Sequence, residues 1–259
     1  MAAANHSDCR ALPKVALVES DNSFAADVQT KLIATGQFSA VDIIDAATVT
    51  PTVVQLQAYR SVLVWSNSSF VDSVALGNNI DTYLRAGGGV VVAVFANTDP
   101  GSLELQGAWA TNGDSPMTVA NQSQGVELTL GTINVVGSPL LAGVSSFDGG
   151  SSSYHDPGTL TAGAVDVADW SNGTPLIATK LINGFQVVML NFFPPSSDVS
   201  SDFWLASTDG TQLIVNALNY AGVASAPAVA TAVPALSEWM MAALAVLLLA
   251  AGIWRVRRR

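Results

Sequence analysis

The chain has 259 residues, of which 49% are hydrophobic and only 12% are charged, enough to bury one sizeable core but not two. Acidic side chains outnumber basic ones by 20 to 10, and four of the basic residues occupy the last five positions. Residues 1–254 are therefore strongly negative and repel nucleic acid. Cys9 is the single cysteine, which excludes an internal disulfide. We expect it in a disordered leader over residues 1–13. Because this leader lacks the basic and apolar parts of a signal peptide, we expect the true start of the protein to lie upstream.

The first half of the chain predicts alternating strands and helices. An apolar run at residues 14–19 leads through a polar turn into apolar residues at helical spacing, and the same unit recurs over residues 38–56. A third unit over residues 61–95 contains three consecutive glycines, Gly87 to Gly89, which end its helix before a β-branched strand. Continuous apolar strands that alternate with helices indicate a parallel sheet with helices on both faces. The sequence therefore predicts a doubly wound, mostly parallel, flavodoxin-like α/β fold.

The second half of the domain predicts antiparallel excursions from this sheet. Residues 98–169 are rich in Gly, Ser, Asn and Asp, with short alternating segments that are typical of antiparallel strands and long loops. Two apolar runs at residues 176–181 and 185–193 are joined by Asn183-Gly184, which is a strong hairpin signal. An amphipathic helix over residues 212–221 closes the domain. We expect the whole domain to span residues 14–222.

A linker and a membrane helix are predicted after the domain. Residues 223–232 are rich in Ala, Val and Pro without periodicity, as is typical of a semi-extended linker. The run from Trp239 to Trp254 carries no charge, and a helix over about residues 237–254 approaches the length needed to cross a bilayer. Arginine strongly opposes burial in the bilayer, so we expect the C-terminus in the cytoplasm and the domain across the membrane. A buried core helix is the alternative, which the missing amphipathic periodicity disfavours.

The C-terminal segment over residues 233–259 combines a short motif, one helix and an arginine cluster. Its motif Val-Pro-Ala-Leu-Ser-Glu-Trp resembles the Ile-Pro-Thr-Leu-Ser-Glu-Trp of the IPTL-CTERM sorting signals of Gram-negative bacteria, which are relatives of the PEP-CTERM signals handled by exosortases. The resemblance implies export, retention in the inner membrane, and cleavage by an exosortase-type enzyme before display at the cell surface. An uncleaved single-pass membrane protein is the alternative. The residues of the signal are Val233, Pro234, Leu236, Ser237, Glu238, Trp239, Arg255, Arg257, Arg258 and Arg259.

A second resemblance covers residues 14–222. It rests on the helix and strand over residues 84–95, the sequence Ser-Pro-Leu-Leu-Ala-Gly-Val at residues 138–144, and the closing helix. The order of these elements is similar to that of the class I glutamine amidotransferase-like superfamily, particularly its ThuA-like members. The resemblance implies a nucleophilic Cys on the turn after the strand that follows the glycines, and a His after a later strand. These turns read Val-Phe-Ala-Asn-Thr at residues 94–98 and Asn-Phe-Phe-Pro at residues 191–194. We therefore expect no glutaminase activity and assign no catalytic residue.

Other chemistry is not favoured by the spacing of reactive residues. A Ser-His-Asp arrangement would have to be assembled by the fold from residues 151–156, and we expect His155 to be a solvated loop residue. Asp148 and Asp156 could hold an ion loosely, but two histidines and one cysteine make no zinc pattern. Asp114 is predicted to be a solvated turn residue. We therefore predict neither a metal nor a cofactor.

The turns after the predicted parallel strands carry polar side chains. In folds of this kind, ligands bind in the crevice at the carboxyl ends of the strands. The polar residues on these turns are Asp21, Asn22, Ser66, Asn67, Asn97 and Thr98. Such a rim suits sugars or small polyols, although the same residue types occur there simply to cap the following helix. A pocket lined by Asp21, Asn67 and Asn97 together with Trp65 or Phe95 would favour binding.

Two expectations about function follow. The first is an exported, membrane-anchored or surface-sorted protein whose non-catalytic amidotransferase-like domain has a structural or interaction role at the cell envelope. Its partners would be the membrane, the sorting enzyme, and envelope glycans or proteins. The second is a divergent ThuA-like hydrolase or carbohydrate-binding module that uses the strand-end crevice. Fold alone does not choose between them, because one fold hosts many functions.

Overall fold

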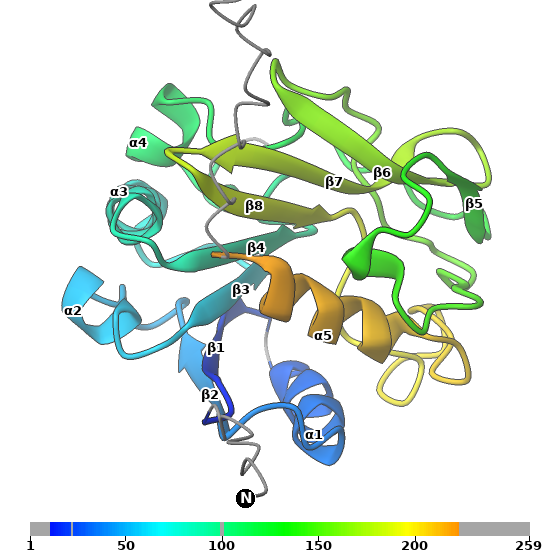
Figure 1. Ribbon diagram of the computed structural model, residues 1–259, viewed down its shortest axis with the longest axis horizontal. Coiled ribbons are helices and arrows are strands. Elements are labelled where there is room, and N and C mark those ends of the chain that lie inside the picture. Colours follow the sequence, from blue (N-terminus) through cyan, green and yellow to red (C-terminus); the bar gives the residue numbers. More distant parts are fainter. Residues whose placement is uncertain (1–10, 22, 99–100, 223–259) are drawn as a thin grey trace, which may run out of the picture. The chain divides into compact units, whose positions relative to one another are not determined.

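The computed structural model describes residues 11–21, 23–98 and 101–222, which form an eight-stranded mixed sheet between two layers of helices (Figure 1). The strand order in the sheet is β2-β1-β3-β4-β8-β7-β6-β5. The strands are β1 Lys14–Ser20, β2 Ala40–Asp45, β3 Ser61–Ser66, β4 Gly89–Ala93, β5 Leu130–Ile133, β6 Ala164–Trp170, β7 Pro175–Ile182 and β8 Phe185–Leu190. The helices are α1 Ala25–Ala34, α2 Val53–Leu56, α3 Ser73–Arg85, α4 Gly107–Thr111, α5 Gly210–Tyr220 and the 3-10 turn η1 Pro139–Leu141.

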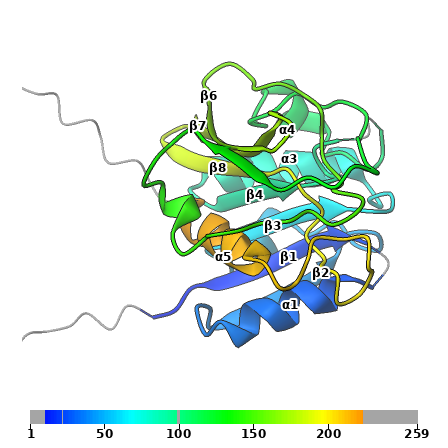
Figure 2. The ribbon, with the colours of Figure 1, turned by 90° about the vertical axis from the view of Figure 1, so that its right-hand side faces the viewer.

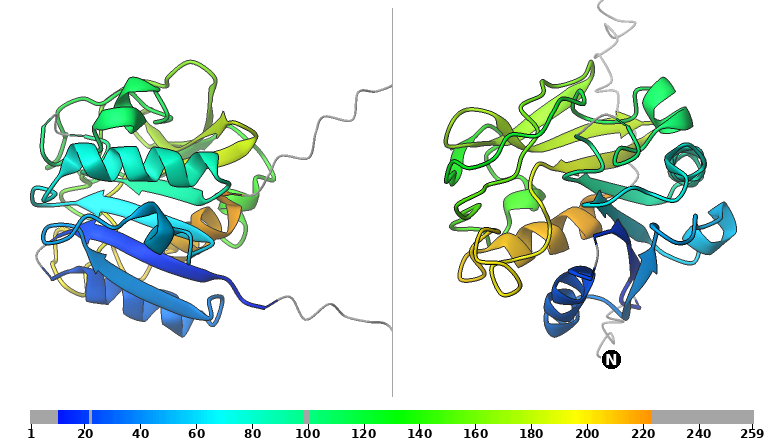
Figure 3. Two further views of the ribbon diagram at one scale, coloured as in Figure 1. Left: turned by 90° about the vertical axis from the view of Figure 1, so that its left-hand side faces the viewer. Right: turned by 180° about the vertical axis from the view of Figure 1, so that it is seen from behind.

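The parallel half of the sheet consists of β2, β1, β3, β4 and β8. Every residue of β3 and β4 is buried, and so is β1 after its first residue, which explains why these strands read as continuous apolar runs. The helices lie on both faces: α3 and α2 lie in front of the sheet in Figure 3 (left), and α5 and α1 cover the face shown in Figure 2. The predicted doubly wound α/β fold is therefore confirmed.

The antiparallel half extends from β8 through β7 and β6 to the edge strand β5. The predicted hairpin joins β7 to β8, and both turn residues have positive φ, 49° at Asn183 and 86° at Gly184, as a type I′ turn requires. Four elements, α4, β5, η1 and all but the last residue of β6, lie within residues 98–169, which the sequence predicts as loops and short antiparallel segments. In β6, the register shifts twice between Asp166 and Asp169, so its apolar residues do not alternate regularly.

No helix within residues 11–21, 23–98 and 101–222 combines the length and apolarity needed to cross a bilayer. The predicted membrane helix at about residues 237–254, the linker over residues 223–232 and the motif residues all lie outside the described residues, as does Cys9. The structure therefore tests the α/β domain, while the C-terminal signal stays a prediction from sequence.

Candidate functional site

A cavity of about 350 Å³ opens at the carboxyl ends of the parallel strands. Asn67 follows β3, Phe95 follows β4, and Phe193 follows β8, so three neighbouring strands bring these side chains to one edge of the sheet. Loops that are distant in the sequence complete the lining with Gln122, Gln124, Tyr154, Ser200, Asp202 and Phe203. This is the crevice in which α/β sheets of this kind bind ligands.

Four aromatic residues of the lining pack against one another. The ring centroids of Phe95 and Phe193 are 5.5 Å apart, those of Phe193 and Phe203 are 4.9 Å apart, and Tyr154 contacts all three rings at 5.5 to 6.3 Å. Most of these pairs meet edge to face, which is a favourable geometry for aromatic contacts. The three Phe rings are at most 7% exposed, whereas Tyr154 is only partly buried. Tyr154 is therefore the ring that most readily offers a face to a ligand.

Asp202 is the carboxylate of the cavity, and hydroxyl groups surround it. Its Oδ1 accepts a hydrogen bond from Ser200 Oγ, and its Oδ2 accepts from Tyr154 Oη at 3.2 Å and from Ser152 Oγ at 3.3 Å. Burial alone would raise the pKa of Asp202, but these hydrogen bonds outweigh burial and lower the pKa below its ordinary value. The cavity therefore contains an ionised carboxylate at neutral pH.

Asp21, a predicted crevice residue, is 1% exposed and serves the packing of the domain. Its Oδ1 accepts hydrogen bonds from the amides of Ser23, Phe24 and Ala25 at the start of α1, and its Oδ2 accepts from Trp65 Nε1 at 2.9 Å. The Asp21 amide in turn donates to Glu19 Oε2 at 2.8 Å. Burial, followed by the Asp21 carboxylate, raises the pKa of Glu19 to about 8. At this position the structure favours the capping alternative.

The remaining predicted crevice residues divide between the cavity and the interior. Asn67 is exposed and lines the cavity. Ser66 Oγ donates to Leu103 O at 2.7 Å, and Thr98 Oγ1 donates to Ala120 O, so both hydroxyl groups are used inside the fold. Asn97 is 1% exposed and accepts from Ser115 Oγ, beside a separate cavity of about 160 Å³. Asn22 lies outside the described residues.

His155 is buried, contrary to the prediction of a solvated loop residue. It is 4% exposed, its Nδ1 lies 2.7 Å from Ser153 O, and its ring packs 6.1 Å from the Trp170 ring. Burial lowers the pKa of His155, so the imidazole is neutral at neutral pH. Ser153 Oγ donates to Gly150 O at 2.8 Å, and Asp156 Oδ1 accepts from the Gly158 amide at 2.6 Å. Ser153 Oγ therefore donates to a backbone carbonyl, and His155 Nδ1, which would meet an aspartate in a Ser-His-Asp relay, lies against the Ser153 carbonyl instead.

Asp114 is also buried rather than solvated. Its carboxylate accepts two hydrogen bonds from Arg85 Nη2, at 2.9 and 3.1 Å, and Arg85 also pairs with Asp81. Burial, together with Asp81, raises the pKa of Asp114 to about 7. Asp148 Oδ1 accepts from the Gly150 amide at 2.9 Å. Within the described part of the chain, no group of three or more His, Cys, Asp or Glu side chains could hold a metal ion.

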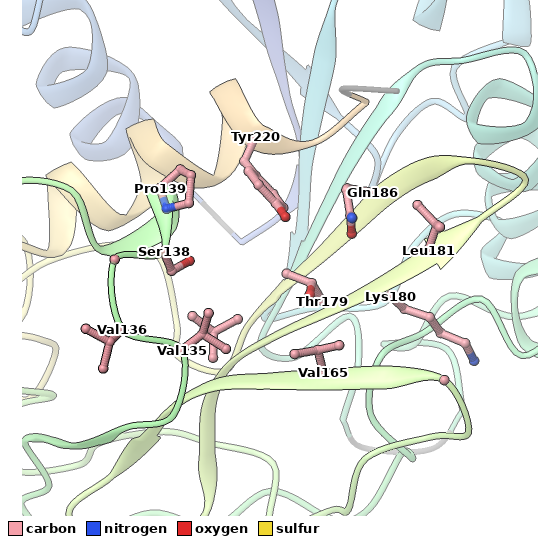
Figure 4. A pocket seen from close by; sticks show the side chains of 13 residues that line it. Val135, Val136, Ser138, Pro139, Val165, Thr179, Lys180, Leu181, Gln186 and Tyr220 are labelled. Atoms are coloured by element: carbon pink, nitrogen blue, oxygen red, sulfur yellow. The ribbon is translucent and has the colours of Figure 1, made fainter. Parts of the chain in front are cut away.

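A second cavity, of about 300 Å³, lies at the opposite end of the parallel strands (Figure 4). It is surrounded by Val135 from the loop after β5, Pro139 from η1, Val165 from β6 and Tyr220 from α5. Next to it, the Gly222 amide donates to Gln186 O at 3.1 Å. This groove is mainly apolar and lies away from the strand ends where such folds bind ligands.

No protein-family model matches the sequence, and no curated protein matches it. The structure is similar to a ThuA-like protein from Bacteroides uniformis, with a TM-score of 0.59 and 15% identity over 84% of this chain and 94% of that chain. It is similar to cytoplasmic protein STM3548 from Salmonella typhimurium, with a TM-score of 0.59 and 12% identity over 80% of this chain and 98% of that chain. At these identities the likeness shows the fold alone. The described part of the domain therefore shares its fold with a ThuA-like protein, in agreement with the predicted layout.

Two of the aromatic residues of the cavity lie on the turns where the resemblance places catalytic residues. The turn after β4, where the resemblance places a nucleophilic Cys, contributes Phe95 to the cavity. The turn after β8, where it places a His, contributes Phe193. The sequence indicates Asn67 and Phe95 as pocket residues, but Tyr154, Asp202 and Phe203 come from long loops without a pattern that would place them there.

Proposed function

We propose that this chain is an exported, surface-sorted protein whose α/β domain binds a saccharide in the strand-end cavity without acting on it chemically. The observation that carries this proposal is the lining of the cavity, which combines four aromatic residues with amide and hydroxyl groups. Pockets of this composition bind compact ligands through apolar contact and a few polar groups that fix orientation. A sugar ring offers both an apolar face and many hydroxyl groups, so it matches this lining.

The polar side chains of the cavity suit hydroxyl groups well. Asn67, Gln122 and Gln124 each carry an amide that both donates and accepts hydrogen bonds. Tyr154 supplies a partly exposed ring against which the face of a sugar can pack. The role proposed for the cavity therefore uses groups from two loops and from the turn after β3.

Binding without catalysis is supported by the groups that line the cavity. Glycosidases generally use a pair of carboxyl groups on either side of the scissile bond. Among the described residues of the lining, Asp202 is the only carboxylate, and the two turns that carry the chemistry in amidotransferases contribute Phe95 and Phe193. A divergent hydrolase is therefore the weaker candidate.

Surface sorting is supported by the resemblance of residues 233–259 to IPTL-CTERM signals. A linker over residues 223–232 would hold the binding domain away from the membrane until the sorting enzyme releases it. The low content of charged residues in the whole chain, 12%, agrees with a surface protein that stays soluble through small polar groups. In this proposal the domain works at the envelope or in extracellular material.

Binding of oligosaccharides by the full-length chain in mild nonionic detergent tests this function. Glucose-, mannose- and glucosamine-based oligomers form the panel, and isothermal titration calorimetry gives the Kd. We expect at least one oligomer to bind, and we expect Tyr154→Ala to weaken its binding about tenfold because a stacking face is lost. Tyr220→Ala, which changes the same residue type at the other cavity, is the matched control. Absence of binding at millimolar concentration, or equal losses in both variants, would contradict the proposal.

A further inference from the structure

The charge of Asp202 is not balanced by a cation within the described part of the chain. Its partners Ser200, Ser152 and Tyr154 are neutral hydroxyl donors. The described ion pairs join Lys14, Lys31 and Arg85 to other carboxylates, and none of them includes Asp202. A partly buried carboxylate that is hydrogen-bonded but not neutralised attracts a cationic group.

Neutral donors alone hold the Asp202 carboxylate. Three hydroxyl groups and the backbone amide of Asp202 donate to its oxygens, and none of these groups carries a positive charge. The hydroxyl donors fix the carboxylate in place at the edge of the cavity, beside the ring of Tyr154. A donor from the ligand would therefore meet a preorganised acceptor.

The ring of Tyr154 favours the same kind of ligand. It is partly exposed and held by contacts with Phe95, Phe193 and Phe203, and the face of an aromatic ring attracts cations. The overall excess of acidic over basic side chains, 20 against 10, also draws cations toward the surface. The Asp202 carboxylate, the ring of Tyr154 and the negative net charge thus all favour a cationic ligand.

We propose that the ligand of this cavity is a saccharide that carries a protonated amine, and that Asp202 binds the amine. This inference rests on the function proposed above and names the ligand class of that site. The amine pairs with the Asp202 carboxylate, while the sugar ring packs on Tyr154 and its hydroxyl groups meet Asn67 and Gln124. Neutral sugars lack the charge-assisted hydrogen bond and bind more weakly.

The test compares three tetrasaccharides on the full-length chain in nonionic detergent: the β-1,4-linked tetramers of glucosamine, N-acetylglucosamine and glucose. Calorimetry at about pH 5 keeps the amines protonated and most carboxylates of ordinary pKa ionised. We expect the glucosamine tetramer to bind about tenfold or more tightly than either neutral tetramer, because a hydrogen bond between charged groups is worth that much. Asp202→Asn, which keeps the shape of the side chain, should abolish this preference.

Two control variants separate direct contact from general charge. Asp198→Asn removes the same charge from the same loop, at a side chain that is 61% exposed and pairs with Lys31, so it should keep the preference. Tyr154→Phe keeps the ring and should also keep the preference. Loss of preference in Asp198→Asn, or binding of neutral tetramers with no gain from the amine, would overturn the inference and leave saccharide binding standing. Absence of binding to all three tetramers would overturn both.

Discussion

Replacing Glu19 with Gln should change how the stability of the domain depends on pH. Glu19 is 5% exposed in β1, two residues before Asp21 and paired in register with Asp45 of β2, so its ionised form is disfavoured in the folded state. Its folded pKa is about 8, against an ordinary value of 4.5. Between these values the folded protein holds a proton that the unfolded chain has lost. The free energy of unfolding therefore falls as the pH rises through this range.

The size of this effect follows from the difference between the two pKa values. At 1.36 kcal/mol for each pKa unit, Glu19 should lower the free energy of unfolding by about 3 kcal/mol between pH 5 and pH 8. Glu19→Gln keeps an acceptor for the Asp21 amide but cannot ionise, so this part of the slope disappears.

Urea unfolding of wild type and Glu19→Gln, followed by near-UV circular dichroism at several pH values, measures the difference between the two slopes. Asp114 and Asp166, whose pKa values are also raised, to about 7 and about 6, contribute equally to both proteins and cancel. Parallel curves for the two proteins over this range would refute the reasoning about Glu19.

Three further predictions concern packing and sorting. Gly77→Ala should lower the free energy of unfolding by about 2 kcal/mol, because the added Cβ would lie 1.9 Å from Gln106 O. This overpacking outweighs the gain in helix propensity. Urea unfolding with an unchanged Cm would contradict the prediction. Trp65→Phe removes the Nε1 donor to the Asp21 carboxylate and leaves a void, so the free energy of unfolding should fall by about 3 kcal/mol. Thermal unfolding measures this change, and a Tm equal to that of wild type would argue against the contact. Replacing Pro234 and Trp239 with Ala should trap the protein in the inner membrane of its host. Cell fractionation and intact mass measure this, and unchanged localisation would favour an uncleaved membrane protein.

The sequence predicts the parallel half of the fold well because strands that are buried on both faces have a recognisable composition. β1, β3 and β4 are buried on both faces, so they appear as unbroken apolar runs. The Asn183-Gly184 turn requires positive φ at both residues, which few other dipeptides adopt easily. These elements depend on local chemistry, and local chemistry can be read from the chain.

The site is harder to predict because its parts come from distant segments. Tyr154 and Asp202 are 48 residues apart in sequence and meet through one hydrogen bond between two long loops. His155 lies in a Gly- and Ser-rich stretch, yet the ring of Trp170 covers it. Asp21 has the residue type of a crevice ligand, but its carboxylate accepts from four donors, which come from the turn before α1, the first residue of α1, and β3. Tertiary packing sets the burial and the partners of each of these side chains, and no local sequence pattern indicates them.

The most direct test of the central claim is a crystal structure of the full-length protein with a bound oligosaccharide. The account predicts that the sugar lies in the strand-end cavity, with one ring packed on Tyr154 and polar contacts to Asn67 and Asp202. A sugar bound in the groove beside Tyr220, or a saccharide that binds in solution but leaves the strand-end cavity unchanged, would contradict it.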